Sequence, residues 1–379
     1  MHNASVTGVP GTLGTREECQ TQCPTAQNSQ QPAKAIIEYL MERVPEYRLL
    51  RELREKGWQN PKGDLFFQRQ RHQADNADRS TSRHFFNMMK KIGREIHDAT
   101  GVLQIETPSS EHSMILDISE HSMILDMCMA PGGFIATVLS LNPRSRTSGF
   151  TLPPSDGGHE VLLPRSTNVI LKYLDITMLA EDMGVTKIQA DHPDVKNFFP
   201  KQFEEGQAFH LVLCDGQVLR TQERAPYRKQ REARRLINSQ LALGLEHVRP
   251  GGTMIVLLHK AEAWDTVQLM YTFSKFSSVQ LIKPMWFHAK RSSFYMVATK
   301  IQSHHPQAIL AIEKWKEIWK VATFGTDEAY METICKFETD VEVILRDFGE
   351  ELVRLGKTVW DIQAKALARA PFIKAQENK

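Results

Sequence analysis

A short apolar segment that ends in an acidic residue and runs directly into a paired-glycine turn is the strongest constraint in this sequence. The nonapeptide Asp126–Phe134 reads DMCMAPGGF and follows the apolar residues that begin at Met123. Glycine lets a backbone approach a ligand closely, and the amides at the start of a following helix favour a carboxylate or phosphate group. We therefore predict a buried strand, a ligand-binding turn and a helix at Gly133–Leu141. The spacing differs from G-x-G-x-x-G, which argues against a dinucleotide fingerprint.

The sequence after this turn alternates short apolar runs with segments of helix length. Such alternation is typical of an α/β fold with a doubly wound, mostly parallel, Rossmann-like sheet, and the last two strands follow each other without a helix, as an antiparallel pair would. The predicted strands are Met123–Asp126, Ser148–Leu152, Val169–Leu174, His210–Cys214, Thr253–Leu258, Val279–Ile282 and Phe294–Thr299. The predicted helices between them are Gly133–Leu141, Ala233–Glu246 and Ala263–Phe276.

The flanking regions differ from this centre in composition. Residues 1–33 are rich in Gly, Thr, Gln, Pro and Asn and are predicted to be a disordered tail. Amphipathic spacing predicts helices in residues 34–105, including Ser82–Ala99, and again in the C-terminal extension 301–379, with the α/β domain at 106–300. In the extension, Gly325 is predicted to stop one helix and Thr326 to cap the next. Trp315 and Trp319 are expected to be core contacts.

Two nearly identical nonapeptides precede the turn. Ser110–Ile118 reads SEHSMILDI and Ser119–Met127 reads SEHSMILDM. A single tandem pair indicates a local duplication, because a solenoid needs longer and more numerous repeats. Only the second copy leads into the glycines, so the strand that precedes the turn is assigned to the second copy. The first copy is either an edge strand or a looped-out insertion.

Composition excludes several classes of protein. The five cysteines are odd in number and too few for a disulfide scaffold, and no metal site is predicted because Cys19 and Cys23 lack partner ligands nearby. No run approaches the ~20 apolar residues of a membrane span. The chain begins without a charged and then apolar leader, so an intracellular protein of nucleus or cytoplasm is expected. A net charge of +2 does not by itself indicate a nucleic-acid partner.

The turn and three further motifs resemble, in order, those of the FtsJ/RrmJ-like ribose 2′-O-methyltransferases. The further motifs are HLVLCDGQ at His210–Gln217, VRPGGTMIVLL at Val248–Leu258 and RSSFYMVAT at Arg291–Thr299. The likeness covers about residues 82–300. It implies a Rossmann-like fold and S-adenosylmethionine as the cofactor.

The resemblance also implies which residues bind the cofactor. Asp126, Gly132 and Gly133 would hold its methionine end, with Asp215 at the end of the fourth strand. Thr151 stands where family members usually have an acidic residue for the ribose, and Asp175 matches the acidic residue near adenine. Ala130, Pro131 and Phe134 complete the set of predicted cofactor-binding residues in the turn.

The catalytic residues match the family less well. The family activates a ribose hydroxyl with a Lys–Asp–Lys–Glu tetrad, whose central lysine can act as a base. Asp215 matches the tetrad, but the other three positions fall on Asn87, Leu257 and Ser293. Three hypotheses remain open. Lys260 together with Lys90 or Lys91 rebuilds the site, the enzyme methylates a different nucleophile, or the protein binds the cofactor without turnover. His259 is expected to face the same side of the strand as Leu257, but an imidazole differs chemically from the lysine of the family.

A basic segment follows Asp215 closely. It lies at the strand end where substrates bind in open α/β sheets, so it is predicted to contact RNA phosphates, although a solvated helix face explains it equally well. The predicted RNA-binding residues are Arg220, Arg224, Arg228, Arg231, Arg235, Lys290 and Arg291. RNA is thus the expected partner, and the helical C-terminus is a candidate surface for a protein partner.

Overall fold

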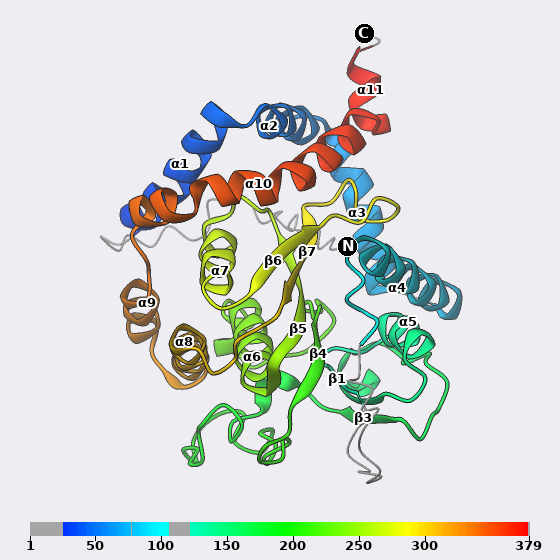
Figure 1. Cartoon of the computed structure of the whole chain (residues 1–379), viewed down its shortest axis with the longest axis vertical. Helices are drawn as coiled ribbons and strands as arrows, with labels where there is room; N and C mark the ends of the chain where they lie inside the picture. Colours follow the sequence, from blue (N-terminus) through cyan, green and yellow to red (C-terminus); the bar gives the residue numbers. More distant parts are fainter. Residues whose placement is uncertain (1–25, 77, 106–121, 378–379) are drawn as a thin grey trace, which may run out of the picture.

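A computed structural model describes residues 26–76, 78–105 and 122–377, and in it one seven-stranded sheet organises the chain (Figure 1). The strand order is β3-β2-β1-β4-β5-β7-β6. All neighbours are parallel except β5–β7 and β6–β7, which are antiparallel. The predicted doubly wound, Rossmann-like α/β class is therefore confirmed. The strands are β1 (Met123–Asp126), β2 (Arg146–Thr151), β3 (Val169–Tyr173), β4 (Phe209–Cys214), β5 (Val248–His259), β6 (Ser278–Ile282) and β7 (Ser293–Thr299).

Helices cover both faces and one end of the sheet. The described helices are α1 (Ala26–Arg43), α2 (Pro45–Trp58), α3 (Pro61–Asp75), α4 (Arg79–Thr100), α5 (Gly133–Leu141), α6 (Glu232–His247), α7 (Trp264–Ser274), α8 (Pro306–Phe324), α9 (Asp327–Lys336), α10 (Val341–Ala368) and α11 (Pro371–Glu377). Helices α4 and α5 lie on one side of the sheet, and α6, α7 and α8 lie on the other (Figure 1). The long helix α10 packs against α1, α2 and β6, which places helices from the N-terminal and C-terminal regions side by side (Figure 1).

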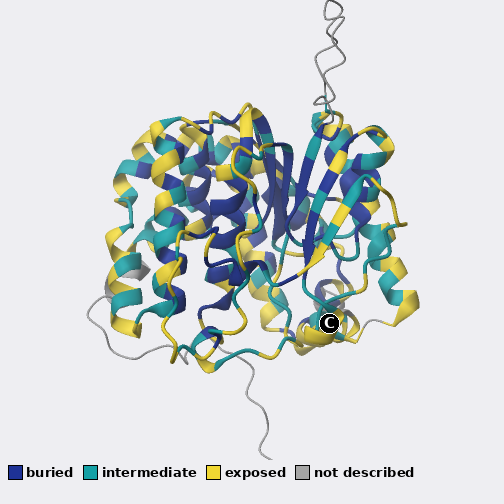
Figure 2. Ribbon diagram, turned by 90° about the horizontal axis from the view of Figure 1, so that it is seen from below, coloured by how far each residue is buried: buried dark blue, intermediate teal, exposed yellow. Residues whose placement is uncertain are grey.

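The sheet separates two apolar cores. One contains Val212 of β4, Leu245 of α6, and Trp319 and Trp360 of the C-terminal helices. The other contains Ile92 of α4 with Phe134, Val138, Leu213 and Tyr295. Figure 2 shows the buried residues concentrated along the central strands and the inner helix faces. Trp315 and Trp319 are both buried, as expected for core residues.

Two glycines allow helix α4 to lie against α5. A Cβ on Gly133 would lie 2.3 Å from the backbone oxygen of Phe86, and a Cβ on Gly93 would lie 3.2 Å from the Phe134 ring. The hydroxyl of Thr137 also donates to the Lys90 carbonyl across 3.2 Å. This close crossing places α4 at the carboxyl ends of the parallel strands.

Several local predictions can be compared with the structure. The strand at Met123–Asp126 and the helix at Gly133–Leu141 have the predicted bounds, and the hydroxyl of Thr326 caps α9 through the Ala329 amide at 3.2 Å. The predicted tail is wrong from Ala26 onward, since α1 begins there, and Ala and Gln are good helix formers. The first nonapeptide copy lies outside the described residues. Within the described residues, no helix is long and apolar enough to cross a membrane.

Candidate active site

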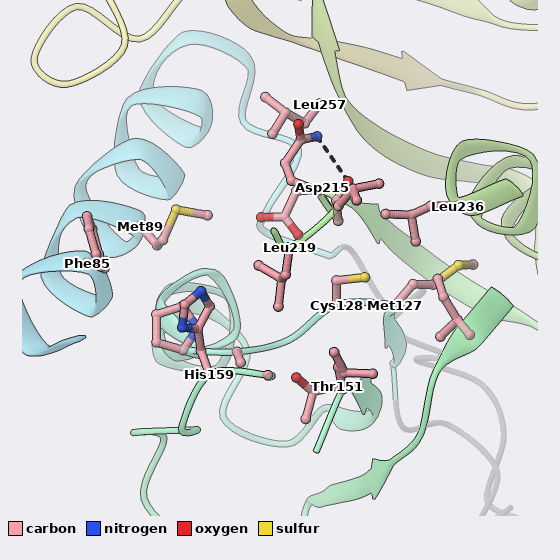
Figure 3. A pocket seen from close by; sticks show the side chains of 18 of the residues that line it. Phe85, Met89, Met127, Cys128, Thr151, His159, Asp215, Leu219, Leu236 and Leu257 are labelled. Atoms are coloured by element: carbon pink, nitrogen blue, oxygen red, sulfur yellow. Dashed lines mark hydrogen bonds between the residues drawn. The ribbon is translucent and has the colours of Figure 1, made fainter. Parts of the chain in front are cut away.

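A cavity of about 340 Å³ opens at the carboxyl ends of the parallel strands. This edge is where open α/β sheets bind their ligands. Figure 3 shows Phe85 and Met89 of α4 on one side of the cavity, Met127 and Leu236 on the other, and Asp215 between them. The volume lies at the lower end of the range for small-molecule sites.

The glycine turn contributes to the cavity through its first half only. Ala130 and Pro131 line the cavity, whereas Gly132, Gly133 and Phe134 do not. Gly132 has a φ of 97°, a left-handed conformation, and its Cα faces Leu163. Gly133 contacts α4, and Phe134 lies edge-on to Tyr295 in the core. Gly132, Gly133 and Phe134 thus lie in the turn without lining the cavity, and their contact with the cofactor stays a prediction.

Two carboxyl groups lie close together beneath the cavity. Asp126 is 2% exposed and accepts a hydrogen bond from the Cys128 amide at 3.1 Å. Burial, and then the charge of Asp215, raise the pKa of Asp126 well above its usual value. Burial also raises the pKa of Asp215, which lines the cavity, to about 7. A positively charged ligand in the cavity would stabilise the ionised forms of both groups.

The two other predicted cofactor residues lie at the same edge. Thr151 ends β2 and lines the cavity, as does Asp175 beyond β3. One oxygen of Asp175 accepts bonds from the Thr177 amide at 2.9 Å and the Thr177 hydroxyl at 2.8 Å. The other accepts from Gln222 at 2.9 Å and Arg228 at 2.6 Å. Four donors fill the acceptor sites of a carboxylate, so Asp175 holds the cavity wall together through these bonds.

The far end of the cavity is lined by residues of β5, β7 and the loop that precedes β7. Leu257 and His259 of β5 face the cavity together with His288, Arg291 and Ser293. In the β5–β7 ladder, His259 pairs with Ser293. The Nε2 atom of His259 lies 3.0 Å from Oε1 of Gln217, which follows Asp215 by two residues.

The predicted catalytic lysines do not lie in this cavity. No lysine lines it in the part of the chain that the structure describes. Lys90 and Lys91 are exposed on α4, where their ammonium groups lie 5.8 Å from the rings of Phe86 and Phe287 respectively. Lys260 has a φ of 50° and is exposed beyond the end of β5. The prediction that these lysines rebuild the tetrad is thus not supported, because none of the three lines the cavity.

A buried lysine that the sequence analysis missed lies beside the cavity. Lys283 is 4% exposed and donates to the carbonyl oxygens of Arg291 and of Ser293, the latter at 2.6 Å. Burial, and then the charges of Arg54 and Arg291, lower the pKa of Lys283 to about 7. Because its ammonium is bonded to backbone, Lys283 fixes the loop between β6 and β7. Its position between two predicted strands gave no signal in the sequence.

The basic segment is largely internal. Arg228, Arg231 and Arg235 are 5%, 7% and 0% exposed, and each is paired with a carboxylate. Arg235 donates to Glu232 at 2.7 Å, and Arg228 donates to the same carboxylate at 2.6 Å. The prediction that these three bind RNA phosphates is therefore not supported, because their side chains are buried and already paired with carboxylates.

The remaining predicted RNA contacts are more accessible. Arg220 is exposed but is paired with Asp75 at 2.7 Å. Arg224 is partly buried and donates to the Leu219 carbonyl. Arg291 lies on the rim of the cavity and donates to Gln70 at 3.1 Å, and the ammonium of Lys290 lies 5.4 Å from the Phe66 ring. Among the described residues Arg224, Lys290 and Arg291 have no carboxylate partner, and of these three Arg291 lines the cavity.

The residues of the cavity fit S-adenosylmethionine. One part has apolar walls from Met127, Ile176 and Leu236, which suit an adenine ring. The carboxyl group of Asp215, which lines the cavity, suits the positive charge of the sulfonium or ammonium group, with Asp126 buried close to it. A Rossmann-like sheet with an antiparallel β7, and this cavity at its carboxyl edge, define the methyltransferase class of α/β proteins.

The family model of FtsJ-like methyltransferases matches residues 108–301. The chain belongs to the FtsJ-like methyltransferase family. S-adenosylmethionine is accordingly its cofactor, as the turn motif predicted.

Solved structures of methyltransferases also resemble the chain. An O-methyltransferase family protein from Burkholderia thailandensis shares 14% identity and a TM-score of 0.30, covering 61% of this chain and 63% of that one. Human methyltransferase-like protein 13 in complex with SAH shares 12% identity and a TM-score of 0.31, covering 67% and 99%. An rRNA methylase from Streptococcus thermophilus shares 15% identity and a TM-score of 0.28, covering 55% and 98%. No curated protein matches the sequence.

Proposed function

We propose that the protein transfers a methyl group from S-adenosylmethionine to a ribose hydroxyl of RNA. Family membership supports methyl transfer, and the motif resemblance supports RNA as the substrate. The observation that carries the acceptor chemistry is His259, which lines the cavity on the same face of β5 as Leu257. The two residues are two positions apart, or about 6.6 Å along a strand. The proposed proton acceptor therefore lies two positions beyond Leu257, where the family has its lysine.

His259 is suited to accept a proton from a hydroxyl. Its Nε2 donates to the amide oxygen of Gln217, which leaves Nδ1 unprotonated. Burial, and then the charges of Lys283, Arg291 and Lys260, lower the pKa of His259, so the ring is neutral near pH 7. The cofactor supplies an electrophilic methyl group when bound. His259 would accept the proton of the substrate hydroxyl at Nδ1, the ring nitrogen that Gln217 leaves free.

Cofactor binding without turnover is the second candidate function. It is favoured by the absence of lysine from the described cavity lining, since lysine is the residue that the family uses as base. In that case the C-terminal helices would act as the surface for a protein partner. Ile309 and Leu310 of α8 are 46% and 55% exposed and would form part of it.

Methyl transfer to RNA distinguishes the two functions. Purified protein is incubated with total RNA and S-adenosylmethionine labelled in its methyl group, and the RNA is then digested to nucleosides. We expect label in 2′-O-methylated nucleosides. His259→Ala should lower the rate by about 100-fold or more, whereas Lys260→Met should leave it nearly unchanged. Label on a base would contradict the ribose assignment. Calorimetric binding of the cofactor with no labelled RNA would favour the second function.

A further inference from the structure

An exposed tryptophan lies in the loop that contributes His288 and Arg291 to the cavity lining. Trp286 is 79% exposed and Met285 is 63% exposed, and both lie in the loop that joins β6 to β7. Trp286 precedes the cavity residue His288 by two positions, so their Cα atoms are at most about 7.6 Å apart. A large aromatic side chain so exposed in a loop that also lines the cavity is a candidate for contact with the substrate.

This loop is fixed on helix α4. The Met285 amide donates to Oε2 of Glu95 at 2.7 Å, and the Phe287 ring lies 5.9 Å from the His84 ring. Lys283 holds the other side of the loop through the Ser293 carbonyl at 2.6 Å. Trp286 is thus presented by a loop anchored before and after it. An anchored platform loses little conformational entropy when a ligand stacks on it.

The neighbouring surface of α4 is basic. Helix α4 contains five basic residues against two acidic ones. Arg83, Lys90 and Arg94 recur at helical spacing along one exposed stripe, and Lys91 lies next to it, beside Phe287. None of these four forms an ion pair within the residues that the structure describes. Their charge is therefore available to an anionic partner.

We propose that Trp286 and this α4 stripe form a binding surface for single-stranded RNA at the cavity mouth. Trp286 stacks on a base beside the target nucleotide, while Lys91, Arg94 and their neighbours contact phosphates. An exposed aromatic group combined with unpaired cations is the chemistry that binds single strands, since bases stack on rings and phosphates attract lysine and arginine. The inference rests on the proposed function and names the part of the protein that selects the substrate. It replaces the internal arginines of residues 228–235 as the RNA-binding surface.

Binding is tested by fluorescence anisotropy with a labelled, mixed-sequence, single-stranded RNA. We expect Trp286→Ala to weaken binding by about 5- to 100-fold, and Trp286→Phe to retain most of it. Trp58, which is 62% exposed on α2, provides the matched control, and Trp58→Ala should leave affinity unchanged. Lys91→Gln and Arg94→Gln should each reduce the slope of log affinity against log salt by about 0.7.

The outcomes separate this inference from the proposed function. If the wild type binds and methylates RNA while Trp286→Ala matches it in both assays, the surface is overturned and the function stands. If Trp286→Ala weakened binding to a blunt duplex RNA as much as binding to the single strand, base stacking by Trp286 would be overturned. If the wild type neither binds nor methylates RNA, both proposals fall. Calorimetric titration of S-adenosylmethionine into Trp286→Ala should give wild-type affinity, which shows that the variant is folded.

Discussion

The guanidinium of Arg228 donates to the carboxylate of Asp175 across 2.6 Å and joins the cavity wall beyond β3 to the start of α6. The same arginine donates to Glu232 at 2.6 Å, so one cation is shared by two carboxylates. Although burial alone would raise the pKa of Asp175, the charge and hydrogen bonds of Arg228 and Thr177 lower it below its usual value. The basic segment therefore shapes the cofactor cavity from inside.

Replacing Arg228 should destabilise the fold. Arg228→Met leaves Asp175 and Glu232 buried with one cation fewer, and we expect a loss of about 3 kcal/mol in the free energy of unfolding. Urea denaturation near pH 7 measures it. The contribution of Asp175 requires its ionised form, so it is present above the pKa of an unfolded aspartate and is lost as the pH falls through the lowered pKa in the folded protein. Arg220→Met, which breaks an exposed pair, should cost less than about 1 kcal/mol. A stable Arg228→Met protein with weakened RNA binding would contradict this internal role.

Cofactor affinity should rise with pH because of Asp215. Its pKa of about 7 leaves it largely protonated in acid, whereas the positive charges of S-adenosylmethionine favour its ionised form. Between about pH 6 and pH 8 we expect affinity to increase by up to about tenfold, measured by calorimetry. Asp215→Asn cannot ionise and should flatten this dependence. A steep rise that persists in the variant would assign the titration to another group.

The α4–α5 crossing should not tolerate a side chain at position 133. In Gly133→Ala the new Cβ would lie 2.3 Å from the Phe86 carbonyl oxygen and 2.7 Å from Met89 Cβ, and a backbone atom cannot move aside cheaply. We expect a loss of about 3 kcal/mol in stability by urea denaturation. Gly206 has a φ of 73° with no atom near its Cβ position, so Gly206→Ala should cost only about 1 kcal/mol. Equal losses would show that backbone conformation, and not the close helix contact, determines the effect.

The sequence predicted most of the sheet because its signals are local. Apolar runs bounded by turns located each strand of the described residues, and the run ending at Asp126 gave β1 with its bounds. Helix α3 lies in the predicted helical segment 34–105, but its bounds were not predicted because its sequence is mostly polar and has weak apolar periodicity. The helix packs against α2, which directly precedes it, and against α11, which is distant in the sequence.

The site was predicted less completely because its decisive contacts join distant parts of the chain. The Arg228–Glu232 spacing was visible in the sequence, but Asp175, 53 residues away, gave no sign that it would neutralise the same arginine. Similarly, the paired glycines predicted a ligand-binding turn. In the structure Gly133 leaves room for α4, and no local sequence pattern predicts that α4 packs there. The sequence predicted which side of the strand His259 faces. Its hydrogen bond to Gln217 could not be predicted, because the fold brings these distant residues together.

The central claim is that this cavity holds S-adenosylmethionine, and two adjacent residues of α6 test it. Leu236 lines the cavity, whereas Ile237 faces a separate hollow between α6, α7 and α9. We predict that calorimetry gives one cofactor per wild-type chain, that Leu236→Trp weakens binding at least about tenfold by filling the adenine end, and that Ile237→Trp binds normally. Wild-type affinity in a folded Leu236→Trp protein would contradict the account.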